Sequence, residues 1–142
     1  RPGQFALIIV DAFSSDAIPM HLLTKEAVAL YLSRLREDGV IALHISNRYL
    51  DLEPVAARIA QELGLVALHN DDDQHDLPGK QVSQWIALAR KPEYLAPLLH
   101  IGPIEFDGQS ITPRPWTPAR STPDSPLWTD DFSNILSVLS WK

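Results

Sequence analysis

The sequence contains no cysteine, which excludes disulfide frameworks, zinc sites built on thiolates and cysteine nucleophiles. It also lacks an apolar run long enough to span a bilayer, since the longest covers only residues 5–10. Basic residues are in the minority: 12 lysines and arginines stand against 18 aspartates and glutamates, a net charge of -6. Nucleic-acid binders normally carry the opposite sign. We therefore expect a cytoplasmic segment whose partners include neither nucleic acid nor a membrane.

The six glycines are too scattered to form a glycine-rich turn. Doubly wound nucleotide-binding folds place such a turn after their first strand, where the ligand meets a helix N-terminus. The length of 142 residues and the hydrophobic content of 45% otherwise fit one globular domain. We interpret the chain as the second half of such a fold and expect a first half to precede Arg1.

Strand and helix patterns alternate along the first hundred residues. Apolar, β-branched runs at residues 5–10, 40–45 and 65–69 predict strands, the first of them covered on both faces. Apolar residues at helical spacing predict helices over residues 25–37 and 51–63. This alternation is typical of right-handed crossovers and a mostly parallel sheet.

Local signals set the ends of these predicted helices. Thr24 and Asp51 are expected to cap their N-termini. Gly39 and Gly64 are expected to end them in the left-handed conformation. A fourth strand, over residues 84–90, follows a loop without helical pattern, so we expect it to pair antiparallel with its predecessor.

The character of the chain changes after residue 101. Six of the 12 prolines fall between residues 102 and 127, which excludes a regular helix or a central strand there. We therefore predict three parts: a partial α/β domain over residues 1–101, an extended proline-rich segment over residues 102–127, and a tail over residues 128–142 that docks on the core.

The first candidate site is the run V-D-A-F-S-S-D-A-I-P at residues 10–19. Its acids, Asp11 and Asp16, follow the first strand at the sheet edge where open α/β folds bind ligands. One carboxylate could accept a proton from an amine nucleophile while the other anchors the cation. The alternative is structural: Asp11 caps the loop and Asp16 lies in a solvated turn.

This run, followed by H-L-L-T and by a strand ending H-I-S-N-R, resembles the spermidine synthase family. The resemblance is strongest to bacterial members fused to, or encoded beside, a transporter-like membrane segment, and the closing W-T-D-D-F-S-N-I-L-S-V-L shares it. It covers nearly the whole chain but only the second half of the catalytic domain. It implies a Rossmann-like, methyltransferase-type doubly wound sheet that is mostly parallel with one antiparallel strand. It further implies aminopropyl transfer from decarboxylated S-adenosylmethionine to a diamine such as putrescine, with no tightly bound cofactor.

The resemblance also assigns residues. Asp16 corresponds to the acid that orients and deprotonates the attacking amine, and Asp11 with Ala12 lies beside the nucleoside co-substrate. The chain departs from the family in that Ala12 and Phe13 lie between the acids as an insertion, and Met20 replaces a glycine. Two alternatives therefore stay open: an S-adenosylmethionine-dependent methyltransferase, or a non-catalytic amine- or nucleoside-binding module attached to a transporter.

Residues 44–48 form a second candidate group, at the end of the second strand and so at the same sheet edge. Asn47 and Arg48 could hydrogen-bond a ligand or close the loop over it, and Asn47 is the better substrate-binding candidate of the group. His44 lies inside an apolar strand, which favours a packed histidine over a catalyst.

Two acidic segments remain. Asp130 and Asp131, with the rings of Trp128 and Phe132 nearby, suit an amine substrate. In the alternative, these two rings anchor the tail and the acids begin a helix. The acidic run at residues 70–76 lacks the ligand spacing of a calcium loop, so we favour a solvated loop and expect no metal site. No Ser/His/Asp constellation is recognisable from local context.

In a methyltransferase-type sheet, a strand from the first half of the domain pairs with residues 5–10. Without that strand, residues 5–10 form an open edge that is a template for another chain. We expect either self-association through this edge or its coverage by the proline-rich segment or the tail. We favour self-association because prolines make a poor pairing strand.

Overall fold

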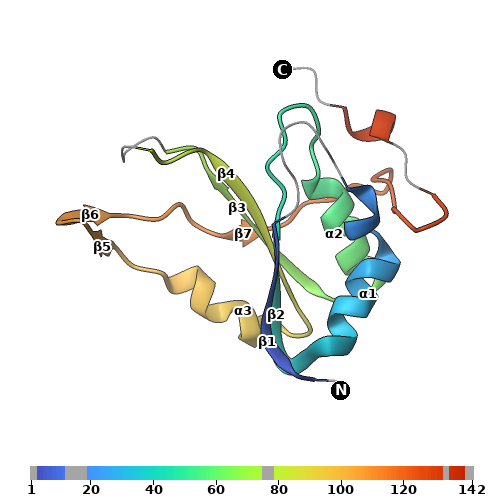
Figure 1. Ribbon diagram of the computed structural model, residues 1–142, viewed down its shortest axis with the longest axis horizontal. Coiled ribbons are helices and arrows are strands. Elements are labelled where there is room, and N and C mark those ends of the chain that lie inside the picture. The colour runs from blue at the N-terminus through green and yellow to red at the C-terminus, as the bar shows by residue number, and fades with distance from the viewer. Residues whose placement is uncertain (1–2, 12–18, 75–78, 133–134, 140–142) are drawn as a thin grey trace.

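The computed structural model describes residues 3–11, 19–74, 79–132 and 135–139. These residues form a five-stranded sheet in the order β1-β2-β4-β3-β7 and a separate hairpin of β5 and β6 (Figure 1). The strands are β1 (Phe5–Val10), β2 (Leu35–His44), β3 (Val66–Asp72), β4 (Ser83–Ala89), β5 (Ile104–Phe106), β6 (Gln109–Ile111) and β7 (Thr117–Pro118). The α-helices are α1 (Lys25–Arg34), α2 (Glu53–Glu62) and α3 (Pro92–Leu95), and 3-10 turns cover Met20–Leu22, Ala96–His100 and Ile135–Val138.

The fold is mixed α/β, as predicted, but the expectation of mostly parallel pairing is wrong. Within the main sheet only β1 and β2 pair in parallel, while β2–β4, β4–β3 and β3–β7 are antiparallel. The antiparallel pairing of β4 with its predecessor β3 is confirmed. Because β4 lies between β2 and β3, the strands β1, β2 and β3 still run in one direction.

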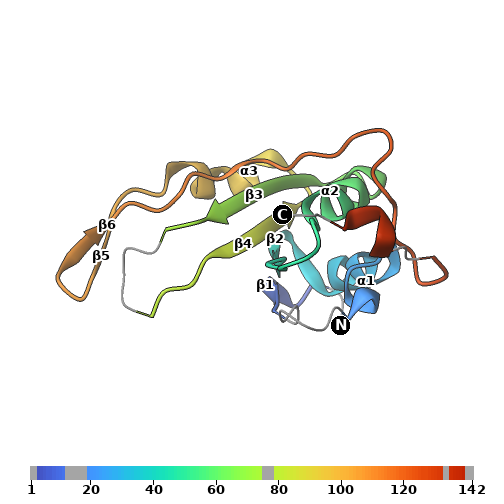
Figure 2. The ribbon, with the colours of Figure 1, turned by 90° about the horizontal axis from the view of Figure 1, so that it is seen from above.

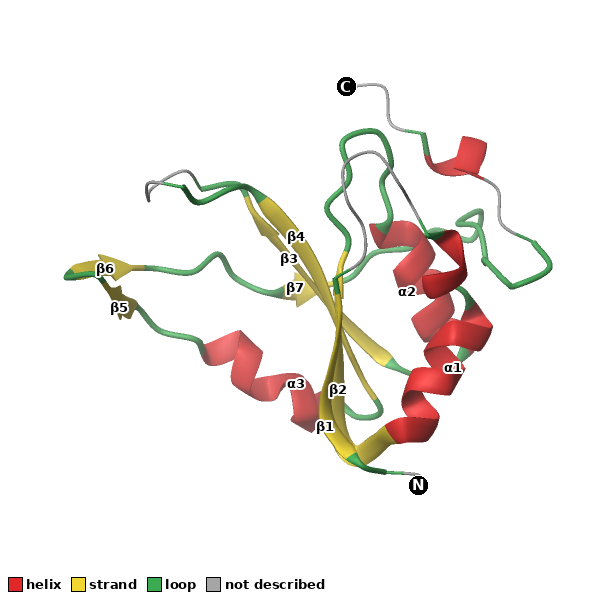
Figure 3. Cartoon of the chain, in the orientation of Figure 1, coloured by secondary structure: helices red, strands yellow, loops and turns green. Residues whose placement is uncertain are grey.

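Helices cover the two faces of the sheet unequally (Figure 3). On one face α1 packs on β2, and α2 packs on β3 and β4; on the other face the short α3 packs on β4 and β2. The main core lies under α1 and α2, and it includes the fully buried Trp128 together with Val138. Two described residues near the end of the chain, Trp128 and Val138, therefore pack on this core. No helix among the described residues is both long and apolar enough to cross a bilayer.

β1 is the sheet's edge strand, and one of its faces is open. Ile8 and Val10 pack toward the main core, while the alternating side chains of Phe5, Leu7 and Ile9 are 51%, 52% and 59% exposed. The prediction that both faces of this strand are covered is therefore wrong. Neither the proline-rich segment nor the tail pairs with β1 in the described part of the chain, because β2 is its single sheet neighbour there.

The junction between α1 and β2 differs from the prediction. The helix ends at Arg34 rather than at residue 37, and β2 begins at Leu35, which pairs with Phe5 across an irregular register. Gly39 therefore lies inside β2 and is not among the described glycines with positive φ. A Cβ built on Gly39 would lie 2.6 Å from Cγ of Leu35 and 3.0 Å from the carbonyl oxygen of Ala6. Close packing, not a left-handed turn, requires glycine at this position.

Among the other predicted helix ends, those at Thr24 and Gly64 follow the local signals, and the one at Asp51 does not. The Thr24 side chain accepts a hydrogen bond from the Ala27 amide and caps α1, as predicted. The predicted cap at Asp51 is wrong: Leu52 is the N-cap residue of α2 and no side chain caps it, while the Asp51 carboxylate, one residue earlier, accepts from the Glu53 amide at 3.2 Å. Gly64 follows α2 with φ of +66°, which confirms the predicted left-handed ending.

The proline-rich segment follows the outer edge of β3 (Figure 2). β7 pairs with Leu68 and His69 in β3, and the Asn70 side chain donates to the carbonyl oxygens of Arg114 and Pro115. The segment is extended, but prolines did not keep it from pairing: it supplies the two-residue edge strand β7 and the β5–β6 hairpin. It thus covers the edge at β3 and leaves the edge at β1 open.

Candidate functional site at the carboxyl ends of β1 and β2

The parallel register of β1 and β2 places Asp11 beside His44. Val10 pairs with Leu43, so the next residue of each strand lies at the same edge of the sheet. The Nδ1 atom of His44 lies 2.6 Å from Oδ1 of Asp11. The Asp11 side chain is 61% exposed and that of His44 only 21%, so an accessible carboxylate contacts a largely buried imidazole.

Two further contacts fix His44 from the side of β4. Its Nε2 atom lies 2.7 Å from the hydroxyl oxygen of Ser46, and that oxygen accepts a hydrogen bond from the Gln84 amide at 2.7 Å. The imidazole stacks on Trp85, its register partner in β4, with ring centroids 4.7 Å apart and an angle of 22° between the planes. Asp11, His44 and Ser46 thus form one hydrogen-bonded chain at the sheet edge.

The hydrogen-bonded chain of Asp11, His44 and Ser46 changes the interpretation of His44. The residue is packed, as predicted, but it packs through its ring face and uses both ring nitrogens in polar contacts. It also forms the Ser/His/Asp grouping that local context did not reveal. The signal in the sequence is an H-x-S at one predicted strand end and an aspartate at the end of the preceding strand, but only the register joins them.

Several predicted site residues lie outside the described part of the chain. Residues 12–18 carry Asp16, the predicted catalytic acid, and Ala12, predicted to contact the co-substrate. Both assignments stay predictions. Of the predicted acids in this loop, Asp11 is the one the structure describes, and it lies at the expected edge.

Asn47 shapes the loop between β2 and α2. Its carboxamide oxygen accepts from the backbone amides of Tyr49 and Leu50, both at 2.9 Å. This geometry is an Asx-type turn, which uses the acceptor of the side chain within the loop itself. Arg48 beside it is exposed. A ligand role for Asn47 is untested by these contacts, which show a structural one.

Asp130 lies at the N-terminus of α1. Its Oδ1 atom accepts from the Thr24 hydroxyl at 2.7 Å, and its backbone amide donates to Glu26 at 3.0 Å. Trp128 is fully buried, whereas Asp131 and Phe132 are exposed. Of the two interpretations of this segment, Trp128 follows the anchoring one, and Asp131 stays an open substrate-binding prediction.

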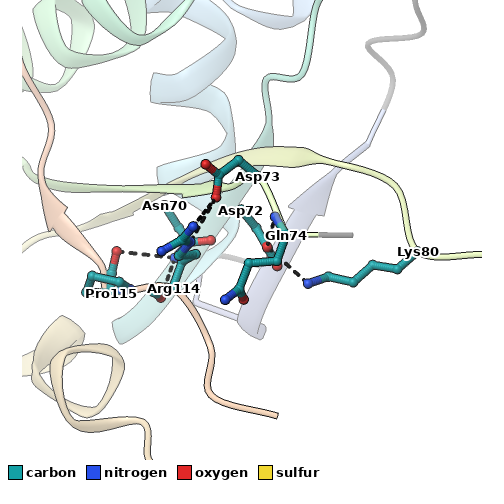
Figure 4. A network of polar contacts seen from close by, with 7 residues as sticks. All are labelled: Asn70, Asp72, Asp73, Gln74, Lys80, Arg114 and Pro115. Atoms are coloured by element: carbon teal, nitrogen blue, oxygen red, sulfur yellow. Dashed lines mark hydrogen bonds and ion pairs between the residues drawn. The ribbon is translucent and has the colours of Figure 1, made fainter. Parts of the chain in front are cut away.

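The acidic run after His69 is divided between a strand and ion pairs. β3 extends through Asp72, which pairs with Lys80 at 3.1 Å, and Asp73 pairs with Arg114 at 2.7 Å (Figure 4). Within the described ranges, no three metal-ligating side chains converge. His75 and Asp76 lie outside those ranges. The charges of Asp72 and Asp73 thus have protein partners.

Sequence reasoning also missed a second histidine–carboxylate pair, formed where α2 begins against β3. The Nδ1 atom of His69 lies 3.3 Å from Oε2 of Glu53, and both side chains are largely buried. A polar hollow opens beside them, lined by Asp71, Asp73 and Arg120 among others. The pair depends on helix-to-sheet packing, for which the sequence carries no local signal.

No protein-family model and no curated protein matches the chain.

Proposed function

We propose that the chain is part of an enzyme that transfers an aminopropyl group from decarboxylated S-adenosylmethionine to a diamine such as putrescine. The observation that carries this proposal is the Asp11 carboxylate, exposed at the carboxyl end of β1 and held by His44. It lies directly before the segment that contains Asp16, and it is an acidic site at the edge where open α/β sheets bind ligands.

The order and directions of the strands support the proposal that the chain is the second half of a larger sheet. Three strands that run in one direction, with β4 inserted antiparallel between β2 and β3, are what the second half of a Rossmann-like, methyltransferase-type sheet would contain. The open edge of β1 is where the other half of such a sheet would pair. Association of two copies through that edge is the competing proposal for its occupant.

The reaction needs an acid–base group and a cation anchor but no metal. Asp16 would accept a proton from the ammonium form of the diamine, which frees the nitrogen lone pair. The nitrogen then attacks the methylene carbon beside the sulfonium, the carbon–sulfur bond breaks, and its electron pair leaves with sulfur as a neutral thioether. The carboxylate of Asp11 would attract the second ammonium group of the diamine, the one that does not react, during this step.

The test is Asp16→Asn in the natural protein that contains this chain. Turnover of putrescine and decarboxylated S-adenosylmethionine should fall on the order of a hundredfold or more, because the substitution removes the base and keeps the shape. Asp124→Asn, an exposed aspartate elsewhere, is the matched control and should leave turnover unchanged.

Three results would contradict the proposal. Near-normal turnover by Asp16→Asn would remove the assigned base. Methyl transfer from S-adenosylmethionine, without aminopropyl transfer, would identify the enzyme as a methyltransferase. Amine or nucleoside binding without either transfer would identify a binding module.

A further inference from the structure

The hydrogen-bonded chain at the end of β2 begins with a group whose role is fixed. The Gln84 backbone amide can only donate, and it donates to Oγ of Ser46 at 2.7 Å. The neighbouring amide of Ile45 donates to the Gln84 carbonyl at 2.9 Å, so Ser46 continues the hydrogen bonding between β2 and β4 with its side chain. The Ser46 hydroxyl oxygen is therefore held in place.

At the other end of the hydrogen-bonded chain, the charge of Asp11 fixes which atoms donate. An ionised Asp11 carboxylate can only accept, so the Nδ1 atom of His44, 2.6 Å away, must carry a hydrogen. In the neutral imidazole, Nε2 is then the acceptor, and it takes the Ser46 hydroxyl hydrogen over 2.7 Å. Each donor of this hydrogen-bonded chain then has one acceptor. The neutral His44 tautomer with hydrogen on Nδ1 satisfies all three hydrogen bonds.

The imidazole is also the more buried member of the pair that it forms with Asp11. It stacks on Trp85 and its side chain is 21% exposed, whereas the Asp11 side chain is 61% exposed at the end of an edge strand. An exposed carboxylate would otherwise sample several rotamers, and holding it in one lowers the entropy lost when a ligand binds. His44 binds Oδ1, and the exposure of the side chain leaves the carboxylate accessible to a ligand.

We propose that His44 is a positioning residue, fixed by Ser46 and Gln84, that holds the Asp11 carboxylate ready to bind an ammonium group of the amine substrate. This inference rests on the proposed function for the class of ligand. The same three side-chain types form nucleophilic triads. Here the Gln84 amide donates to the Ser46 oxygen and fixes it beside the imidazole, and we assign its hydroxyl to orienting His44 rather than to attack on a substrate.

The first measurement is the tautomer of His44, from ¹⁵N NMR of the natural protein that contains this chain. We expect hydrogen on Nδ1 at neutral pH, and loss of this preference in Ser46→Ala. A neutral His44 whose single ring hydrogen is on Nε2 would overturn the inference. So would covalent labelling of Ser46 by a fluorophosphonate probe, because it would show a reactive nucleophile.

The second measurement is the affinity for putrescine, by NMR titration followed at Asp11. His44→Phe keeps an aromatic ring on Trp85 but removes the hydrogen-bond donor, and should weaken binding by about three- to tenfold, the usual worth of one hydrogen bond. His44→Gln retains a donor and should recover part of the loss. The neutral 1,4-butanediol should bind more weakly than putrescine to the unchanged chain.

His69→Gln is the matched control, since it alters the other histidine–carboxylate pair and should not change the affinity. Equal affinity of His44→Phe and the unchanged chain, or no putrescine binding by the latter, would overturn the positioning role. Binding that depends on His44 in a protein without aminopropyl transfer would support this role and refute the proposed reaction. Transfer that is independent of His44 would do the reverse.

Discussion

Gly39 offers a sharp test of the fold. Close packing inside β2 and a left-handed helix ending would both require glycine at this position, but they predict different effects of substitution. In the structure it lies inside β2, and an added Cβ would meet Cγ of Leu35 at 2.6 Å and the carbonyl oxygen of Ala6 at 3.0 Å. Leu35 is 2% exposed and belongs to the main core, so its side chain has little room to move away. Gly39→Ala should therefore overpack this corner.

The expected cost follows from the atoms involved. Overpacking a well-filled site destabilises by about 1–3 kcal/mol. Leu35→Ala alone should cost about 2–5 kcal/mol, the usual range for truncating a buried leucine. It also removes the Cγ and Cδ1 atoms that the new methyl group meets. The double variant should consequently be more stable than the sum of the two losses predicts, by about 1 kcal/mol or more.

Urea unfolding of the four chains measures this coupling. Gly64 is the control: its φ is +66° and nothing lies within 4 Å of an added Cβ, so Gly64→Ala should cost about 1 kcal/mol through backbone strain alone. That loss should be unaffected by Leu35→Ala. Additive losses for Gly39→Ala and Leu35→Ala would refute the packing argument and favour the left-handed helix ending that local sequence predicts.

Two further predictions concern the same region of the molecule. Burial raises the pKa of Tyr31 above 10.0, so the folded chain holds this proton more tightly than the unfolded chain. Stability should then be unaffected below about pH 10 and fall as the pH rises above it, and Tyr31→Phe should abolish this contribution in thermal unfolding; an unchanged alkaline decline would contradict it. In the isolated 142-residue chain, Ile9→Lys on the open face of β1 should reduce self-association, measured by light scattering over a concentration series. Val82→Lys, at another exposed apolar residue, should not. Equal scattering by both variants would count against pairing through β1.

Local signals predicted the features that depend on neighbours in the sequence. Thr24 caps α1 because its hydroxyl needs only an amide three residues ahead. Gly64 ends α2 for a similarly local reason. The prediction that Gly39 ends the helix was wrong because Leu35 pairs with Phe5, so β2 begins before the expected turn. That contact joins residues thirty positions apart, and tertiary pairing outweighed the local preference.

The candidate site divides in the same way. Asp11 was predictable because an acid that follows an apolar strand of a parallel pair lies at the ligand edge. The roles of His44 and Ser46 were not, because they depend on β4 lying next to β2. The sequence predicted that β4 pairs antiparallel with β3, but it carried no signal that β4 would pair with β2 on its other side.

The direction of β4 is what brings its residues to this site. A strand parallel to β2 would begin at the opposite end of the sheet and place its first residues far from Asp11. Because β4 runs antiparallel, its beginning lies at the carboxyl end of β2, where Gln84 meets Ser46 and Trp85 meets His44. The same insertion that leaves β1 and β2 as the single parallel pair of the main sheet in the described chain therefore supplies the amide and the ring that fix His44. The direction of β4 thus determines the geometry of the site. Moving β4 by one residue in register would break both the contact of Trp85 with His44 and that of Gln84 with Ser46.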